Sequence, residues 1–530
     1  MSEGMLSRRD LLRGGRDVGG LLALSTLFQT GPGAASLEAA QAALRAAPDV
    51  YKSIGVRPLI NARGTFTIIS GSLMLPEVRA AMVAASQQYV HLDELADAIG
   101  ARLATLTGAE WGLVTSGCSA GLTHATAACV AGGNPDLHVR IPNLAGFPKD
   151  EVIIPRHSRN VYDAAVRNVG VRIIEVDTMA ELESALGPRT AMIYIMASPR
   201  VDDSVLNLKA MAQAARPKGV PILVDAAAEI LTIPNVHLQN GASVVGYSGG
   251  KCLRGPQTAG LLLGRRDLVK AAWVHSAPHH GPGRAMKVGK EEAIGMLMAV
   301  EMWVKRDHDA EWKQWTAMLD HIARRVSAID GVTTSVSQPN GLSNRTPSLR
   351  ILWDAQRVGV TGDALSRTLL DTEPRIAMPA TRNGALTGVS ITPYMMSAGD
   401  ERIIGDRLAA LLSTRSTLQP PSTPAPPATD LTGRWDVRIE YAAGSSTHTL
   451  HLRQRAGDID GSHQGEFITR DVAGTIDGDA VRIRSAFGEE HGDSIAFVFS
   501  GKVNGNEMSG ALDMGEYLGA TWTAKRRGRA

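Results

Sequence analysis

The sequence predicts an α/β protein with a mainly parallel sheet, followed by a separate all-β domain. Short apolar runs alternate with stretches of helical spacing between residues 110 and 264, which is typical of a parallel sheet covered by helices on both faces. After residue 430, short segments instead alternate apolar and polar residues, with Gly, Asp and Asn between them. Such segments predict antiparallel strands joined by tight turns.

The first 45 residues are expected to lie outside the fold. The segment SRRDLLR at residues 7–13 resembles a twin-arginine export signal, and the apolar stretch at residues 18–28 is too short to span a bilayer as a stable helix. We interpret residues 1–45 as a cleavable signal and a disordered segment, the signal directing the protein to the periplasm or out of the cell. A disordered basic tail is the alternative interpretation.

A large domain is expected at residues 46–300. Residues 75–88 and 92–107 have helical spacing, and an apolar strand at residues 110–116 turns through small residues into another helical pattern. Small side chains let a phosphate approach the backbone amides at a helix N-terminus, where the amides and the helix dipole favour an anion. Ordinary helix capping uses the same residue types. The residues predicted to bind a phosphate are Ser116, Gly117, Cys118 and Ser119.

The later strands of the sheet place a carboxylate at one edge. Strands are expected at residues 150–155, 171–176, 190–196, 220–225 and 258–264, and helices at residues 161–168, 179–186 and 208–215. Ligands of open α/β sheets bind at the carboxyl ends of the strands, where Asp225 lies. If the ligand is a cofactor with a pyridine ring, Asp225 is the candidate for the anion that keeps the ring nitrogen protonated. Its alternative role is to cap an Ala-rich helix after it.

Lys251 is the residue around which the predicted site is organised. It follows an apolar run at residues 243–247 and lies among glycines, so its amine is held close to the backbone, where desolvation favours the neutral, nucleophilic form. Together with Asp225 and the phosphate-binding turn, it predicts a site for pyridoxal 5'-phosphate (PLP). Taken alone, Lys251 could equally be a solvated loop lysine.

A cluster of cations follows the lysine loop. Arg284, Lys287 and Lys290 come directly after a loop rich in His, Gly and Pro. Charge runs are usually solvated faces. The position of this run soon after Lys251 instead favours binding of an anionic substrate group, or of the cofactor phosphate of a partner subunit.

Together, these stretches resemble the family of fold type I PLP enzymes that includes selenocysteine synthase and D-glucosaminate-6-phosphate ammonia-lyase. The motifs are VDAAAE at residues 224–229, YSGGK at 247–251 with GPQ at 255–257, and GRAMKVGKE at 283–291. The resemblance covers residues 51–412. It implies an aspartate aminotransferase-like fold with a small α+β domain at residues 301–416. It also implies that Lys251 forms the Schiff base with PLP, that Asp225 pairs with the pyridinium and that Ser248 binds the phosphate.

The resemblance also implies residues outside these motifs. In this superfamily the N-terminal arm reaches a neighbouring active site, which makes Arg63 a candidate substrate contact. An aromatic or imidazole ring often covers the pyridine; His157 is the candidate, and a loop histidine with a backbone partner is the alternative. The small domain commonly holds a carboxylate-binding arginine, and Arg350 and Arg382 both lie there. The expected catalytic residues are Lys251, Asp225 and His157. The expected substrate-binding residues are Arg63, Arg284, Lys287 and Arg382.

The activity implied by the resemblance is that of a PLP-dependent lyase. Lys251 would move the α-proton of an amino acid or amino-sugar acid, and ammonia or water would leave from the β-position. A racemase, aldolase or aminotransferase would use the same residues. An exported binding protein on the same scaffold is the alternative of another class, but it would have no reason to retain Lys251, Asp225 and the phosphate turn together. Because a phosphorylated sugar acid is unexpected outside the cytoplasm, we expect an unphosphorylated substrate.

Composition limits the partners. The formal net charge of +2 and the absence of a long basic run outside the termini count against nucleic acid, including the aminoacyl-tRNA of a selenocysteine synthase. Cys118, Cys129 and Cys252 show no metal-type spacing, so we expect free thiols and no metal site. The expected partners are a small-molecule substrate and a second copy of the chain, because fold type I sites usually form at a dimer interface. No stable membrane span is expected.

A proline-rich spacer at residues 417–430 leads to a final domain at residues 431–530. Strands are expected there at residues 435–440, 447–453, 481–484, 494–499 and 520–524. GRW at residues 433–435 and GATW at residues 519–522 loosely resemble the closing strands of a lipocalin-like barrel, so we predict a small antiparallel barrel or sandwich. Its role would be ligand binding, or oligomerisation and stability.

Overall fold

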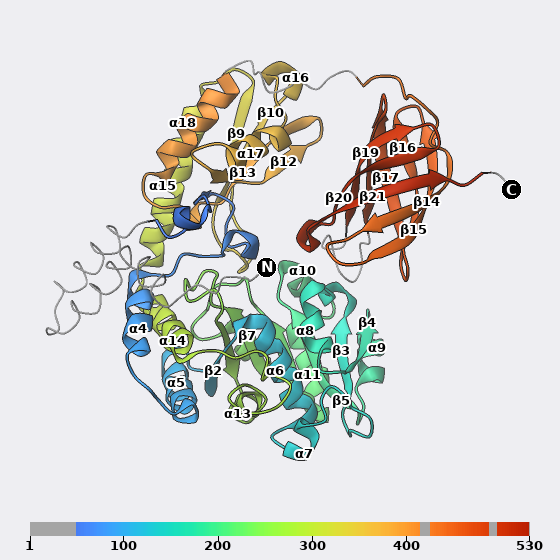
Figure 1. Ribbon diagram of the computed structural model, residues 1–530. Coiled ribbons are helices and arrows are strands. Elements are labelled where there is room, and N and C mark those ends of the chain that lie inside the picture. The colour runs from blue at the N-terminus through green and yellow to red at the C-terminus, as the bar shows by residue number, and fades with distance from the viewer. Residues whose placement is uncertain (1–48, 414–423, 487–495, 529–530) are drawn as a thin grey trace, which may run out of the picture.

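The computed structural model describes residues 49–413, 424–486 and 496–528, which form a large α/β domain, a smaller α+β domain and a β-barrel (Figure 1). The expected export signal lies outside the described residues, as do residues 417–423 of the spacer. In the described part of the chain, no helix combines the length and the apolar character that crossing a bilayer requires.

A seven-stranded sheet forms the centre of the large domain, in the order β2-β8-β7-β6-β5-β3-β4. Its strands are β2 (Trp111–Thr115), β3 (Glu151–Pro155), β4 (Arg172–Val176), β5 (Thr190–Met196), β6 (Ile222–Asp225), β7 (Val244–Ser248) and β8 (Gly260–Gly264). Neighbouring strands are parallel except at β8, which is antiparallel to β2 and β7. β8 follows β7 through the lysine loop without a crossover helix, so it returns in the opposite direction. The prediction of a mainly parallel sheet is confirmed.

Helices cover both faces of this sheet, each with its own apolar core. One core contains α5 (Leu92–Thr107), α9 (Met179–Ala185), α11 (Leu208–Ala215) and α14 (Lys290–Lys305). The other contains α6 (Gly117–Ala131), α8 (Ala164–Arg167) and α13 (Arg266–Val274). The side chains of α6 are small and mostly apolar on every side of the helix, so α6 is buried along almost its whole length. The remaining helices of this domain are α4 (Pro76–Ser86), α7 (Pro135–His138), α10 (Pro199–Asp202) and α12 (Val236–Gln239).

The small domain is an antiparallel sheet packed against helices. The sheet has the order β12-β13-β10-β9, with β9 (Val332–Ser337), β10 (Ser348–Trp353), β12 (Ala380–Asn383) and β13 (Leu386–Ile391). Its helices are α15 (His308–Ser327), α16 (Ala355–Val358), α17 (Gly362–Asp371) and α18 (Asp400–Ser413). The N-terminal arm joins this domain, because β1 (Ile60–Asn61) pairs in parallel with β11 (Ile376–Ala377). Arg63 lies two residues after β1, so this pairing fixes the backbone beside it.

The C-terminal domain is a closed antiparallel barrel, so the predicted barrel is confirmed and the sandwich is not formed. Its strands are β14 (Gly433–Glu440), β15 (Ser445–Arg455), β16 (Asp458–Gln464), β17 (Thr469–Asp477), β18 (Ala480–Ala486), β19 (Phe497–Asn504), β20 (Glu507–Asp513) and β21 (Gly519–Arg526). The first and last strands close it, with Ile439 opposite Trp522. The start of the strand expected at residues 494–499 lies outside the described residues.

Candidate active site

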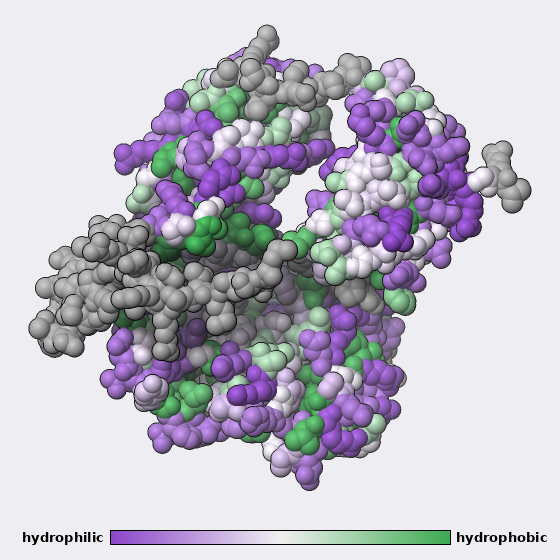
Figure 2. Space-filling model, in the orientation of Figure 1, coloured by the Kyte–Doolittle hydropathy of each residue, from purple (hydrophilic) through white to green (hydrophobic). Residues whose placement is uncertain are grey.

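A cavity of about 500 Å³ opens at the carboxyl ends of β2, β6 and β7. Asn344, Thr392 and Tyr394 of the small domain also line it, so the cavity lies between the two domains. Figure 2 shows apolar surface gathered along the seam where these domains face each other. The sequence-predicted residues that line the cavity are Arg63, Gly117, Cys118, Ser119, Asp225, Ser248 and Lys251. Segments far apart in the chain therefore meet as the PLP prediction requires.

Asp225 is a buried carboxylate at the end of β6, surrounded by donors. Its Oδ1 accepts the amide of Ala227 over 3.1 Å and lies 3.6 Å from Sγ of Cys118, while Oδ2 accepts the hydroxyl of Tyr194 over 3.0 Å. Burial raises the pKa of Asp225, and the Ala227 amide and the Tyr194 hydroxyl oppose that rise. The chain turns after Asp225 without starting a helix, so this carboxylate is not a helix cap.

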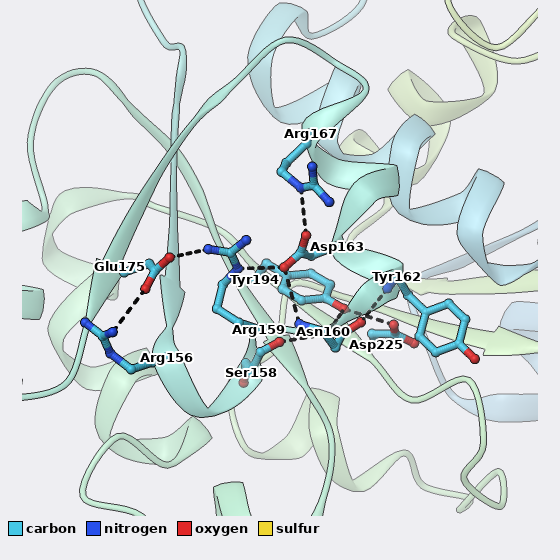
Figure 3. Close-up of polar contacts among 10 residues, drawn as sticks. All are labelled: Arg156, Ser158, Arg159, Asn160, Tyr162, Asp163, Arg167, Glu175, Tyr194 and Asp225. Carbon is cyan, nitrogen blue, oxygen red and sulfur yellow. Dashed lines mark hydrogen bonds and ion pairs between the residues drawn. The ribbon is translucent and has the colours of Figure 1, made fainter. Parts of the chain in front are cut away.

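Tyr194 was not predicted from the sequence, and it is held in place by the loop after β3 (Figure 3). Asn160 donates its Nδ2 to the Tyr194 hydroxyl over 3.2 Å, which leaves the hydroxyl proton directed at Asp225. Asn160 also caps the turn η5 (Val161–Asp163). Asp163 is buried there between the guanidinium groups of Arg159 and Arg167, at 2.6 and 2.8 Å. The only sequence signal was a phenol within the apolar strand at residues 190–196.

The N-terminus of α6 forms a cradle that only small residues allow. Gly117 has a positive φ of 82°, and a Cβ on Gly260 of β8 would lie 2.4 Å from the amide nitrogen of Cys118. Ser116 occupies the N-cap position but makes no side-chain capping bond, and it is not among the described residues that line the cavity. The amides of this first turn and the hydroxyls of Ser119 and Ser248 therefore suit a phosphate. With Lys251 and Asp225, the residues present fit PLP.

Arg63 is the cation best placed for a substrate anion. Its guanidinium lies over the ring of Phe66 at 4.3 Å, and both residues line the cavity. Within the described residues, the buried Nε of Arg63 has no hydrogen-bond partner. A buried guanidinium nitrogen without a partner suits a carboxylate delivered by a ligand.

The other predicted residues lie elsewhere in this chain. His157 is partly buried, with Nδ1 3.1 Å from the Ser158 hydroxyl, and Tyr162 of the same loop lines the cavity instead. Arg382 is exposed on β12 and pairs with Asp363 over 2.8 Å. The structure therefore does not bring these side chains together with Lys251. Three further arginine and lysine side chains are exposed outside the cavity, namely Arg284, Lys287 and Arg350.

Tyr394 is a second residue that sequence reasoning missed. Its hydroxyl lies 2.8 Å from Oγ1 of Thr65 and donates to Oδ1 of Asn344 over 3.1 Å. All three residues line the cavity. Tyr394 thus joins the N-terminal arm to the small domain beside the predicted substrate arginine.

Comparison with known proteins gives the family. Residues 157–343 match the model of aminotransferase class-V. D-glucosaminate-6-phosphate ammonia lyase of Salmonella typhimurium is 30% identical over 371 residues, which are 68% of this chain and 97% of that protein. The chain belongs to the family of this ammonia-lyase. The solved structure of D-glucosaminate-6-phosphate ammonia-lyase agrees, with a TM-score of 0.62 and 29% identity over 69% of this chain and 98% of that one.

Other relatives differ in their named activities. The 5'-C-glycyluridine monooxygenase-decarboxylase of a Streptomyces species is 32% identical over 56% of this chain and 75% of that protein. L-seryl-tRNA(Sec) selenium transferase of Moorella thermoacetica is 26% identical over 58% of this chain and 66% of that protein. The predicted relation to this group, the fold type I architecture and the PLP cofactor are confirmed. The similarity to the ammonia-lyase supports a PLP-dependent elimination lyase.

Proposed function

We propose that the protein removes ammonia or water from an unphosphorylated amino acid or amino-sugar acid by α,β-elimination. The observation that carries this proposal is the single cavity that Lys251, Asp225 and Arg63 line together. It offers an amine, a buried anion and a half-buried cation, which are the groups needed to move a proton, to hold a pyridinium and to bind a carboxylate.

The residues of the chain would divide the chemistry between them. PLP, when bound, would supply an electron sink for the carbanion at Cα. Lys251 would hold the cofactor through Nζ, and the freed Nζ would take the proton from Cα. Asp225 would keep a proton on the pyridine nitrogen, and the first turn of α6 would hold the phosphate. Arg63 would bind the substrate carboxylate and so orient Cα toward Lys251.

The proposal extends to location and assembly. The twin-arginine motif at residues 7–13 supports export, and an exported enzyme would meet unphosphorylated substrates. We propose a homodimer or a higher homo-oligomer as well. Arg284 and Lys287 support this. They are exposed and do not line the cofactor cavity of their own chain, so they are available to bind an anion at the cavity of a second copy.

Product analysis on the purified holoenzyme tests the reaction class. In D-glucosaminate, or a related 2-amino-3-hydroxy acid, the β-hydroxyl would leave as water and addition of water at C2 would release the amino group as ammonia. We therefore expect a 3-deoxy-2-oxo acid and ammonia in equal amounts without an added amino acceptor. Racemisation would release no ammonia, aldol cleavage would give an aldehyde, and transamination would need an acceptor. Lys251→Ala is the control and should abolish turnover. Preferential turnover of D-glucosaminate 6-phosphate would overturn the proposal of an unphosphorylated substrate.

A further inference from the structure

A second cavity, of about 660 Å³, lies next to the cofactor cavity and also between the two domains. Its aromatic lining consists of Trp303 at the end of α14, Trp312 and Trp315 on α15, and Tyr394. We call it the indole pocket. Of these four residues only Tyr394 also lines the cofactor cavity, so the two cavities have largely separate walls.

The charges that line the indole pocket do not balance. Three guanidinium groups and one carboxylate face it. Arg306 is neutralised by that carboxylate, because its Nε lies 3.0 Å from Oε1 of Glu311. Arg254 donates its Nε only to the backbone carbonyl of Leu73, over 3.0 Å, and burial lowers its pKa, as does the nearby Arg306. Arg345 has neither a hydrogen bond nor an ion pair within the described residues. The pocket therefore carries excess positive charge.

The aromatic rings of the indole pocket are held in place by a hydrogen bond and by contacts with one another. Trp303 donates its indole Nε1 to the Leu231 carbonyl over 2.7 Å, which fixes the ring. Trp315 lies between Trp312 and Tyr394. Its ring centroid is 6.1 Å from that of Trp312 and 6.2 Å from that of Tyr394. Trp303 is also packed against His308 and Arg306. The partly exposed rings of Trp312 and Trp315 are therefore the ones that offer faces for a flat ring or for the C–H face of a sugar. The same pocket thus combines apolar faces with unpaired cations.

We propose that the indole pocket binds an organic anion, a carboxylate with a flat or sugar-like face, at a site separate from the cofactor cavity. The rings would cover the face of the ligand, and Arg254 and Arg345 would pair with its carboxylate. This site goes beyond the proposed elimination reaction, which uses none of Trp303, Trp312 or Arg345. The bound anion is a separate ligand, because the carboxylate of the proposed substrate would pair with Arg63 in the cofactor cavity.

The wall between the two cavities gives a route for coupling. Neighbouring residues on two segments face opposite cavities: Lys251 and Asn344 line the cofactor cavity, whereas Cys252 and Arg345 line the indole pocket. Tyr394 faces both, because its hydroxyl contacts Asn344 and its ring contacts Trp315. A ligand in the indole pocket would therefore touch both domains and the supports of the catalytic residues. We expect its binding to shift the absorption of the bound cofactor.

Calorimetric titration of the holoenzyme tests the pocket, with benzoate as the probe and benzamide as its neutral isostere. We expect benzoate to bind at least about tenfold more tightly than benzamide. Arg345→Gln should weaken benzoate binding by about tenfold or more, and Trp312→Leu should weaken it as well. The matched control is Arg350→Gln, since Arg350 is also exposed in the small domain but does not line the pocket. Arg345 is exposed, so its variant is expected to fold, and near-UV circular dichroism checks this.

An Arg63→Gln variant distinguishes benzoate binding in the cofactor cavity from binding in the indole pocket, because Arg63 lines only the former. Benzoate binding that depends on Arg63 and is unaffected by Arg345→Gln would overturn the proposal, as would equal binding of benzamide. The titration is then repeated with saturating D-glucosaminate, whose carboxylate would bind at Arg63. Undiminished benzoate binding is expected for a separate site, and displacement that depends on Arg345 would overturn that separation. Heat of binding needs no turnover, so failure of the proposed lyase reaction would not affect this test.

Discussion

The hydroxyl of Tyr194 donates a hydrogen bond to Oδ2 of Asp225 over 3.0 Å, at the carboxyl edge of the parallel sheet. This bond and the Ala227 amide stabilise the charged form of a carboxylate that burial would otherwise protonate. A pyridinium partner must carry a negative charge to keep its proton on the ring. Tyr194 therefore positions Asp225, the carboxylate that would face the cofactor, although Tyr194 itself does not line the cavity.

Removing this hydroxyl should change the charge state of Asp225. Tyr194→Phe deletes a donor to a buried charge, so we expect a loss of about 1–3 kcal/mol of stability and a higher pKa for Asp225. The pH titration of the bound-cofactor absorbance should shift accordingly. The matched control is Tyr247→Phe, because Tyr247 is equally buried in the sheet but bonds to Asn235. An identical titration in both variants would contradict the role assigned to Tyr194.

Arg63 should control substrate binding. Arg63→Gln removes hydrogen bonds to a charged group that are worth about 1.5–3 kcal/mol, so we expect KM to rise by roughly 10–100-fold with a smaller change in kcat. Steady-state kinetics with D-glucosaminate measures this. Arg382→Gln serves as the comparison, because Arg382 is exposed and paired with Asp363. A larger effect at Arg382 than at Arg63 would transfer the carboxylate-binding role to the small domain.

Gly260 should be required for cofactor binding. In Gly260→Ala the new Cβ would meet the backbone of Gly117 at 2.3 Å, so β8 and the phosphate cradle must move apart. We expect a cost of about 1–3 kcal/mol in stability and weaker binding of PLP. In Gly117→Ala nothing lies within 4 Å of the new Cβ, and only the positive φ is strained. Fluorescence titration with PLP should show the larger loss for Gly260→Ala; the reverse order would contradict the cradle.

The barrel should lose stability as pH falls. His463 is fully buried between His448 and Ser485, and burial, together with His448, lowers its pKa from 6.5 to about 3. Between these two values the unfolded chain binds a proton that the folded barrel does not, so stability is present above pH 6.5 and declines below it. Hydrogen exchange of β15 and β16 peptides, corrected for intrinsic rates, should show this decline. His463→Gln should flatten it, and an unchanged slope would contradict this account.

The cofactor residues were predictable because their signals are local. Asp225 ends an apolar strand, Gly117 and Lys251 come shortly after one, and parallel strands bring their carboxyl ends to one edge. Tyr194 and Tyr394 were not predictable in this way. Their hydroxyls act through contacts made across the sheet or between domains, with Asp225 and with Thr65.

The fold was least predictable where polar residues are buried. β16 has the sequence DIDGSHQ, and its inward positions include Gly461 and His463. Apolar residues at these positions would have made the strand easier to predict. β17 and β20 are similarly polar. α14 and α15 are separate helices, with Arg306 and Asp307 between them. The Asp307 side chain accepts the Ala310 amide over 2.9 Å and so caps α15, a local hydrogen bond that helical spacing alone does not predict.

The central claim is that Lys251 holds PLP in the cavity beside Asp225. Its most direct test is to record the absorption spectrum of the purified protein, reduce it with borohydride and map the modified peptide. We predict a cofactor band near the visible edge that reduction removes, and a pyridoxyl adduct on Lys251. A colourless protein that cannot be reconstituted with PLP, or an adduct on another lysine, would contradict the account.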